Sequence, residues 1–450
     1  MKILKAQKVF DFEQPDWSKD PIMFIAHQIL EQELEIIKLA SPCFPNLDKN
    51  NQMGRSGMTL EQIVRCAIYK QNKELTYREL SIHTYDSKMG IVFMKILDGQ
   101  GFSHQTLQEH ISAITPEVLE KINIKIGKIA IELKLDDGKK MRTDSTAIPA
   151  HIHHPTNCSL LWDCIRVGTR ILKKTKAIFS EIDVRFWQKS AKKLNFQIVN
   201  TRGQEKRIPL FKKLLRIQEK YIAQIETTIT YLKQISVEDA KIEKERQQLI
   251  LELESLLPKM RTVYGAAYRK EILGEKVAIK DKLFSIFEDH TDCIVKGQRL
   301  PTFGHKVNLT SGKSNIIFDV IIERGNPNDT EYYSKTLCNL KNNYNLIPRD
   351  FSTDGGYASI KNLDFAKEHG VKNIVFGKTK GKLQNITSSK KMQTILKKWR
   401  SGIEAIISNL KRAYDSALCK WKGYEKFKSH TLWSVITYNL MMIASLLLDK

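Results

Sequence analysis

The runs "FGHKVNLT" (residues 303–310) and "NIIFDVIIERG" (residues 315–325) decide the fold class of this 450-residue chain. Both are short and rich in Val, Ile, Phe and Thr, and a turn-type segment with Ser, Gly and Lys separates them. This pattern is typical of consecutive strands joined by tight turns. The run "FSIFEDHTDCIV" (residues 284–295) precedes them and has a similar composition. We therefore expect an antiparallel meander over this region.

Helix and strand signals alternate after this meander. We expect helices over residues 329–345 and 359–370, a strand ending near residue 354 and another over 371–377. Upstream, "KMRTDSTAIPA" (residues 140–150) is a further β-compatible run. Three antiparallel strands followed by parallel strands with flanking helices define an α/β domain with a mixed sheet.

Helical regions precede and interrupt this sheet. Thr59 and Gln62 have capping-box spacing at the start of an N-terminal helix. The helix, short turn, helix order around them is compatible with a DNA-binding helix-turn-helix and equally with an ordinary helical bundle. A later region carries Ile and Leu at helical spacing, which predicts an antiparallel helical hairpin with a basic exterior.

The predicted organisation has four parts. A helical N-terminal DNA-binding domain covers residues 1–135, the first part of the α/β domain 136–164, a basic helical insertion 165–280, and the remainder of the α/β domain with the C-terminal helices 281–450. The apolar helices at 210–257 are a candidate surface for contact between copies of the chain.

The formal net charge of +23 is concentrated in two segments. Residues 1–100 hold 13 basic and 13 acidic side chains, whereas residues 166–282 hold 27 and 14, and residues 377–430 hold 14 and 3. Such blocks favour a polyanionic partner, because neutralising phosphates releases condensed counterions. The alternative is a highly charged soluble protein without such a partner.

Cysteine usage and hydropathy bear on the compartment. The seven cysteines are scattered without a CxxC pair, which favours a reducing cytoplasm. The N-terminus lacks the apolar core of a signal peptide, and "LMMIASLLL" (residues 440–448) is by itself too short to span a bilayer. We expect a cytoplasmic protein with no membrane partner.

Three carboxylates stand out as candidates for chemistry. Asp144 lies in "RTDST" and Asp354 in "STDGGY", each in or at the end of a predicted strand. Glu404 lies in "KKWRSGIEAIISNLKR" (residues 397–412), which predicts one helix with Arg400 and Lys411 on the same face as the glutamate. Singly, the aspartates are typical of turns or caps, and Glu404 of a surface pair with Arg400.

Taken together, the carboxylates favour a metal site. Side chains from two strands and a flanking helix would meet at one edge of the sheet and repel each other unless cations lay between them. Hard divalent cations take such oxygen ligands. Two metals then stabilise the attacking and leaving oxygens of a displacement at phosphorus.

The ordered set of motifs resembles the DDE insertion-sequence transposases of bacteria, most closely the ISNCY group. "MRTDSTAIPAHIHHPTNCSLLWDCIRV" (residues 141–167) is similar to the first catalytic strand region of that group, and "STDGGYAS" (residues 352–359) to its second aspartate motif. "RSGIEAIISNLK" (residues 400–411) matches the R-x3-E-x6-K helix. The chain departs from the pattern at Lys397, where many such families have Tyr, and at Asn157, where the family has Asp.

The resemblance implies an RNase H-like fold in which Asp144, Asp354 and Glu404 are catalytic and bind two Mg²⁺ or Mn²⁺ ions. It further implies a transposase that binds the terminal inverted repeats of its element, cuts the DNA and transfers the strands, as a homodimer or larger oligomer in the bacterial nucleoid. The residues assigned to DNA contacts are Arg400, Lys411, Arg412, Lys397, Lys398 and Trp399.

Two alternatives remain open from sequence. An inactive or domesticated relative would retain the fold and the charge and would bind DNA without cutting it. A metal-dependent nuclease would cut DNA but never join strands.

Overall fold

The computed structural model describes residues 15–450 except 46–56, 97–98, 100, 296–299, 380 and 382. Parts of the expected N-terminal domain, residues 1–14 and 46–56, therefore lie outside the described residues. Contacts divide the chain into two compact units, one of residues 1–151 with 294–450 and one of residues 152–293. The second unit is thus an insertion in the sequence of the first.

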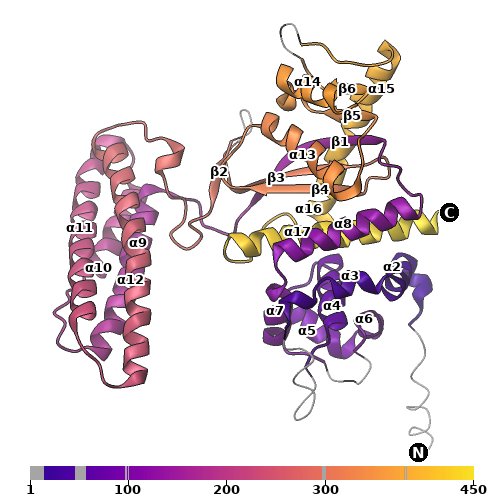
Figure 1. The fold of residues 1–450 in the computed structure, drawn as a ribbon. Coiled ribbons are helices and arrows are strands. Elements are labelled where there is room, and N and C mark those ends of the chain that lie inside the picture. Colours follow the sequence, from indigo (N-terminus) through magenta and orange to yellow (C-terminus); the bar gives the residue numbers. More distant parts are fainter. Residues whose placement is uncertain are drawn as a thin grey trace, which may run out of the picture. The chain divides into compact units, whose positions relative to one another are not determined.

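The first unit is built on a mixed sheet (Figure 1). Its strands are β1 (Lys140–Pro149), β2 (Asp292–Ile294), β3 (Thr302–Ser311), β4 (Ile317–Glu323), β5 (Asp350–Thr353) and β6 (Asn373–Phe376). The strand order is β2–β3–β1–β5–β6, and β4 also pairs with β3. Strands β1, β3 and β4 pair antiparallel, whereas β5 is parallel to β1 and β6 is parallel to β5. The expected mixed sheet is confirmed.

The expected strand over residues 284–295 is wrong for most of its length, because only Asp292–Ile294 forms a strand. The Ser285 hydroxyl accepts hydrogen bonds from the N–H groups of Phe287 (3.2 Å) and Glu288 (3.1 Å). A side chain that binds the backbone two and three residues further on favours a turn. The apolar Ile286 is buried in the core of the helical unit instead of on a sheet.

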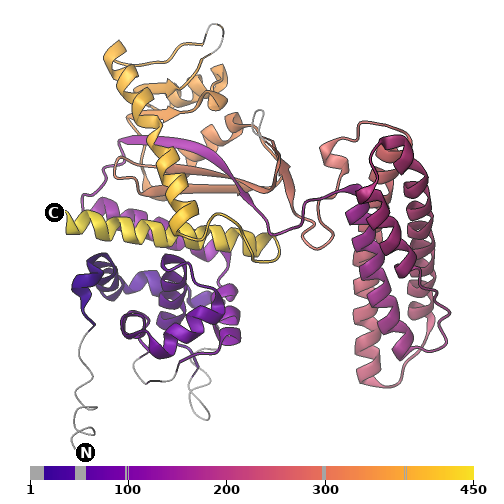
Figure 2. The same ribbon diagram turned by 180° about the vertical axis from the view of Figure 1, so that it is seen from behind.

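Helices cover both faces of the sheet. They are α13 (Asp329–Tyr344), α14 (Ile360–Glu368), α15 (Lys390–Arg400) and α16 (Gly402–Ala413). Neighbouring residues on β5 point to opposite faces: Phe351 packs on Tyr333 of α13, whereas Ser352 donates a hydrogen bond to the carbonyl of Leu396 in α15 at 3.1 Å. Helices α13 and α15 therefore lie on opposite faces. In the view of Figure 2, α15 and α16 lie in front of the sheet.

The described N-terminal residues are helical, as expected. Their helices are α2 (Pro21–Gln32), α3 (Leu34–Lys38), α4 (Leu60–Asn72), α5 (Tyr77–Asp86), α6 (Lys88–Phe93), α7 (His104–Ala113) and α8 (Pro116–Glu132). The predicted capping box of Thr59 and Gln62 is present at the start of α4. A second capping box, Thr76 with Glu79, opens α5. Local sequence signals therefore determine where these helices begin.

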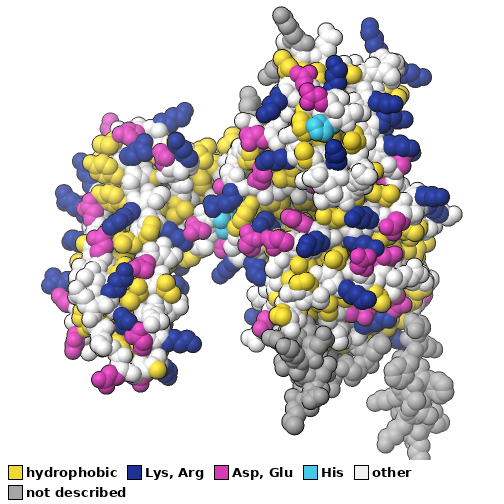
Figure 3. All heavy atoms as spheres, viewed as in Figure 1, with side chains coloured by type: hydrophobic (Ala, Val, Ile, Leu, Met, Phe, Trp, Pro, Cys, Tyr) yellow, Lys and Arg dark blue, Asp and Glu magenta, His cyan; other side chains and the backbone are white. Residues whose placement is uncertain are grey.

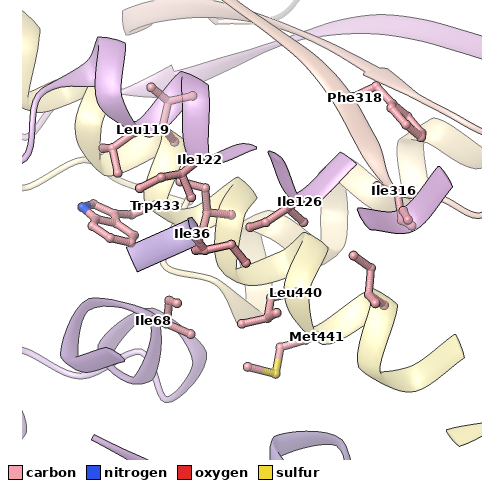
Figure 4. Close-up of a cluster of buried hydrophobic side chains, with 14 of the residues drawn as sticks. Ile36, Ile68, Leu119, Ile122, Ile126, Ile316, Phe318, Trp433, Leu440 and Met441 are labelled. Carbon is pink, nitrogen blue, oxygen red and sulfur yellow. The ribbon is translucent and has the colours of Figure 1, made fainter. Parts of the chain in front are cut away.

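The C-terminal helix α17 (Tyr424–Leu448) packs at the centre of the first unit. The apolar run at residues 440–448, expected to be too short to span a bilayer, is the end of this longer helix. Among the described residues this one helix is long and apolar enough to cross a membrane, and 72% of its apolar window is buried inside the protein. Its Trp433, Leu440 and Met441 belong to a cluster that includes Leu119 of α8 and Ile68 of α4 (Figure 4).

The buried amide of Asn439 is one of the groups that join α17 to the sheet. The Asn439 side chain accepts a hydrogen bond from the Ile317 N–H (2.8 Å) and donates one to the Ile317 carbonyl (2.7 Å). It also donates to the Asn123 side-chain oxygen of α8 at 2.8 Å. The backbone groups at the start of β4 thus find partners on a helix that packs against the sheet.

The second unit is a set of packed helices. These are α9 (Asn157–Ile178), α10 (Gln188–Asn200), α11 (Gln204–Gln234) and α12 (Ala240–Ala267). The expected helical hairpin is present as α11 and α12, and α12 continues through Pro258. On the face drawn in Figure 3, its Lys and Arg side chains alternate with Asp and Glu.

The candidate contact surface at 210–257 is wrong, because its apolar stripe lies inside this unit. Ile225, Leu232, Leu249 and Leu253 are fully buried against the other helices of the unit. Helices α9 and α10, which the sequence analysis did not place against the hairpin, cover that stripe. The stripe is therefore the core of a small helical unit.

Replacing Asn439 by Ala should lower the free energy of unfolding by about 2–4 kcal/mol, because the N–H and C=O of Ile317 would be buried without partners. Urea denaturation measures this change. The control is Asn342→Ala on the exposed side of α13, which should change the free energy of unfolding by less than about 0.5 kcal/mol. Equal effects of the two substitutions would contradict the role given to the Asn439 amide.

Candidate active site

The parallel pairing of β1 and β5 brings two aspartates together. Thr143 of β1 lies opposite Thr353 of β5 in the register. Asp144 and Asp354 are the next residues on the two strands, and parallel strands run side by side at about 4.8 Å. The two carboxylates therefore emerge at the same edge of the sheet, although 210 positions separate them in the sequence.

A glycine at the end of the third parallel strand makes room for Asp354. Gly377 follows β6, and its N–H donates a hydrogen bond to the Thr353 carbonyl at 2.9 Å. A Cβ atom at Gly377 would lie 3.1 Å from Asp354 Oδ1, which is tighter than ordinary contact. Sequence reasoning treated Gly377 only as the end of a strand, because its neighbour across the sheet edge is not local in sequence.

The helix that carries Glu404 is two helices instead of the one expected over residues 397–412. Helix α15 ends at Arg400 and α16 begins at Gly402, with Ser401 in a turn between them. The break leaves the spacing of the predicted pair intact, since Arg400 still lies beside Glu404. Helix α15 contacts β5 and β6, and α16 contacts β1. The break therefore lies above the sheet edge that carries the aspartates.

Arg400 brings the three predicted carboxylates together. Its Nη1 atom is 4.0 Å from Asp144 Oδ2 and 3.8 Å from Asp354 Oδ1, and its Nη2 atom is 3.6 Å from Glu404 Oε1. The oxygens of both aspartates lie within 4.0 Å of one nitrogen, so they are at most twice that distance apart. The contacts are longer than hydrogen bonds. Arg400 is therefore a shared counter-charge and not the tightly bound partner of one carboxylate.

The site is open on one side. The exposed fraction of the side chain is 19% for Asp144, 51% for Asp354 and 64% for Glu404, while Arg400 is 16% exposed. The exposed fraction thus increases from Asp144 on the strand to Glu404 on the helix. A large substrate can approach from the side of Glu404 and Asp354.

The three carboxylates are suitable ligands for divalent cations, although in this structure they are too far apart to bind one together. Within the part of the chain that the structure describes, no group of three His, Cys, Asp or Glu side chains is close enough to hold a metal ion. The Arg400 guanidinium instead lies within 4.0 Å of an oxygen of each of the three carboxylates. Three carboxylates carry more negative charge than one guanidinium offsets. Hard divalent cations prefer such oxygen donors, so the three carboxylates fit such an ion by their donor chemistry.

The predicted DNA contacts fall into two groups. Lys411 and Trp399 face the protein: the Lys411 ammonium donates hydrogen bonds to Thr146 Oγ1 and to the Ala147 carbonyl, both at 2.9 Å. The Trp399 ring has the Lys140 ammonium 4.4 Å from its centroid. The remaining residues are more open, with Lys397 half-buried and Lys398 and Arg412 exposed.

Sequence reasoning missed the polar groups behind Asp144. The Ser145 N–H donates a hydrogen bond to Asp144 Oδ1 at 2.7 Å. The Ser145 hydroxyl donates to Asp329 Oδ1 at 2.7 Å, and the Lys306 ammonium lies 2.7 Å from the same oxygen. Asp329 carried only the signal of a helix start, and nothing local could link it to a strand 184 residues away. These contacts hold the middle of β1 in place behind the site.

Comparison with protein families finds one match, which covers part of the chain that carries this site. Residues 290–440 match the family model described as the transposase DDE domain. The matched part is about a third of the chain; it contains Asp354, Arg400 and Glu404, and Asp144 lies before it. Searches of curated proteins and of solved structures gave no match. The match shows that this part of the chain is similar to the DNA-acting domain of DDE-type transposases.

Proposed function

We propose that the chain is an insertion-sequence transposase that cuts DNA at the ends of its element and joins those ends to target DNA. Asp144, Asp354 and Glu404 are its catalytic residues in this proposal. One observation supports it above the others: side chains from the middle of β1, from the residue after β5 and from a flanking helix all lie around the Arg400 guanidinium. Ionisable groups that gather in an open site are candidates for function.

The three carboxylates would hold two divalent cations, either Mg²⁺ or Mn²⁺. When bound, these ions supply charge stabilisation for the attacking and leaving oxygens of the phosphodiester. Asp144 is the least mobile donor, because the Ser145 N–H already binds one of its oxygens. Asp354 and Glu404 are more exposed and can adjust their oxygens toward the substrate.

Arg400 would exchange one partner for another. In the protein alone it offsets the carboxylates at 3.6–4.0 Å. A guanidinium binds phosphate oxygens with two parallel N–H donors. We infer that Arg400 turns to a DNA phosphate when cations take over the carboxylates. Lys398 and Arg412, which are exposed on the same two helices, would hold the DNA backbone beside it.

Several finer points belong to the same proposal. We infer that the mixed sheet is that of an RNase H-like domain and that the chain belongs to the ISNCY group, as the ordered motifs suggest. Lys411 and Trp399 would support the site from within the protein. The Lys411 ammonium already binds β1, and the Trp399 ring already has the Lys140 ammonium over it. The N-terminal helices and the basic insertion would recognise the terminal repeats. Joining two ends in one complex requires at least a homodimer on the DNA.

Replacing Asp354 by Ala should reduce metal-dependent cleavage of DNA carrying the element ends to no more than about a hundredth of the wild-type rate, because even outer partners of metal ligands cost 10–100-fold. Binding of the same DNA should be retained. The assay compares cleavage with Mg²⁺, with Mn²⁺ and with a chelator, and follows the released 3′-hydroxyl into target DNA.

Asp364→Asn is the matched control, because Asp364 is exposed on α14 away from the sheet edge. It should cleave like the wild type. Binding without cleavage in the wild type would favour an inactive DNA-binding relative, and cleavage without strand joining would favour a nuclease.

Replacing Arg400 by Gln should make the protein more dependent on divalent cations for stability, because the three carboxylates lose their shared counter-charge. Without divalent ions the variant should melt below the wild type. Mn²⁺ should raise its melting temperature by about 2–4 °C more than that of the wild type. Thermal unfolding with and without Mn²⁺ measures this difference.

The exposed Arg412, changed to Gln, is the control for loss of one positive charge on the same helix pair. Its response to Mn²⁺ should equal that of the wild type. An Arg400→Gln variant with the wild-type response would show that the guanidinium does not occupy the cation site.

A further inference from the structure

Arg142 is a buried cation just behind the candidate site. It lies on β1 and is only 3% exposed. It precedes Asp144 by two positions, so both side chains leave the same face of the sheet. Burial lowers the pKa of the Arg142 guanidinium to about 10. A charge that loses its water needs good hydrogen-bond partners, and the positions of these partners show what Arg142 does.

The guanidinium lies at the break between α15 and α16. Its Nη1 atom donates a hydrogen bond to the Trp399 carbonyl at 2.6 Å. In an unbroken helix that carbonyl would accept from the N–H of the residue four positions on, which is Ile403. The guanidinium carbon also lies 4.6 Å from the centroid of the Trp399 ring. Arg142 therefore takes the place of a helix hydrogen bond and fills the space beside it.

A glycine on the other side of the break lets the guanidinium approach. A Cβ atom at Gly402 would lie 2.1 Å from Arg142 Nη1 and 2.9 Å from its guanidinium carbon. Any side chain at this position would therefore displace the far end of Arg142. Gly402 lies midway between Arg400 and Glu404, the two residues that face the aspartates.

The remaining donors tie the break to the sheet. Arg142 Nε donates to Ser311 Oγ at 3.2 Å, and Nη2 donates to Asn315 Oδ1. Ser311 ends β3, and Asn315 lies in the turn before β4. The three donors point in different directions within one rigid plane. One side chain thus connects β1, the β3–β4 turn and the break between the two helices.

We propose that Arg142 is a positioning residue for the active site. Its guanidinium sets the break at which α16 starts, and so it sets the direction in which Glu404 faces Asp144. The affinity of the three carboxylates for divalent cations then depends on Arg142, although Arg142 is not itself a ligand. This inference rests on the proposed metal-dependent function and names the residue that gives the site its geometry.

Mn²⁺ binding measured by electron paramagnetic resonance of the free ion tests the inference without relying on activity. Arg142→Gln and Gly402→Ala should each weaken Mn²⁺ binding by about tenfold or more, as loss of supporting contacts does at other metal sites. Gly402→Ala leaves every atom of Arg142 in the chain and only displaces its end. Arg142→Lys should fail to restore binding, because one ammonium cannot make the planar set of contacts.

Controls separate positioning from folding and from the proposed function. Arg349→Gln alters an arginine that is half-exposed and paired with Asp350, and it should bind Mn²⁺ like the wild type. Affinity for element-end DNA should change less than about threefold in Gly402→Ala, because the phosphate-binding side chains remain. Wild-type Mn²⁺ affinity in both Arg142→Gln and Gly402→Ala would overturn the inference and leave the proposed function standing. A wild-type protein that neither binds Mn²⁺ nor cuts DNA would overturn both.

Discussion

Three negative charges gathered at one edge of a sheet repel one another unless a cation lies between them. In this protein Arg400 meets that requirement, with ion-pair contacts to Asp144, Asp354 and Glu404. The contacts are loose and the site is open, so the guanidinium balances the charge without binding any one carboxylate tightly. Such an arrangement suits a site in which the compensating cation is exchanged during function.

The rest of the first unit serves to bring these groups together. Parallel pairing places Asp144 and Asp354 side by side, because each follows one of two threonines that face each other in the register. Gly377 leaves space at the third strand end. Helix α17 packs against the sheet, and the Asn439 amide binds it to β4. Each contact is ordinary in itself, and together they place distant residues at one edge.

The sequence allowed the two aspartates and the glutamate to be chosen because each has a local signal. Asp144 and Asp354 are each in or at the end of a predicted strand, and Glu404 shares the face of a predicted helix with Arg400 and Lys411. The mixed sheet was predictable from short β-rich runs and alternating helices. Capping boxes located the starts of α4 and α5, since their partners are three residues apart.

What could not be predicted depends on contacts between distant residues. The break at Ser401 arises where Arg142, 257 residues away, binds the Trp399 carbonyl. The inward direction of Lys411 depends on acceptors on β1. Burial of the stripe at 210–257 depends on helices α9 and α10. In each case the local pattern was compatible with more than one environment, and packing selected among them.

A crystal structure of the protein with Mn²⁺ and a cleaved element end would show directly which groups bind the cations. We expect anomalous density for Mn²⁺ between oxygens of Asp144, Asp354 and Glu404, with the Arg400 guanidinium moved onto a DNA phosphate. Absence of Mn²⁺ from this edge of the sheet, with Arg400 still between the carboxylates, would contradict this expectation.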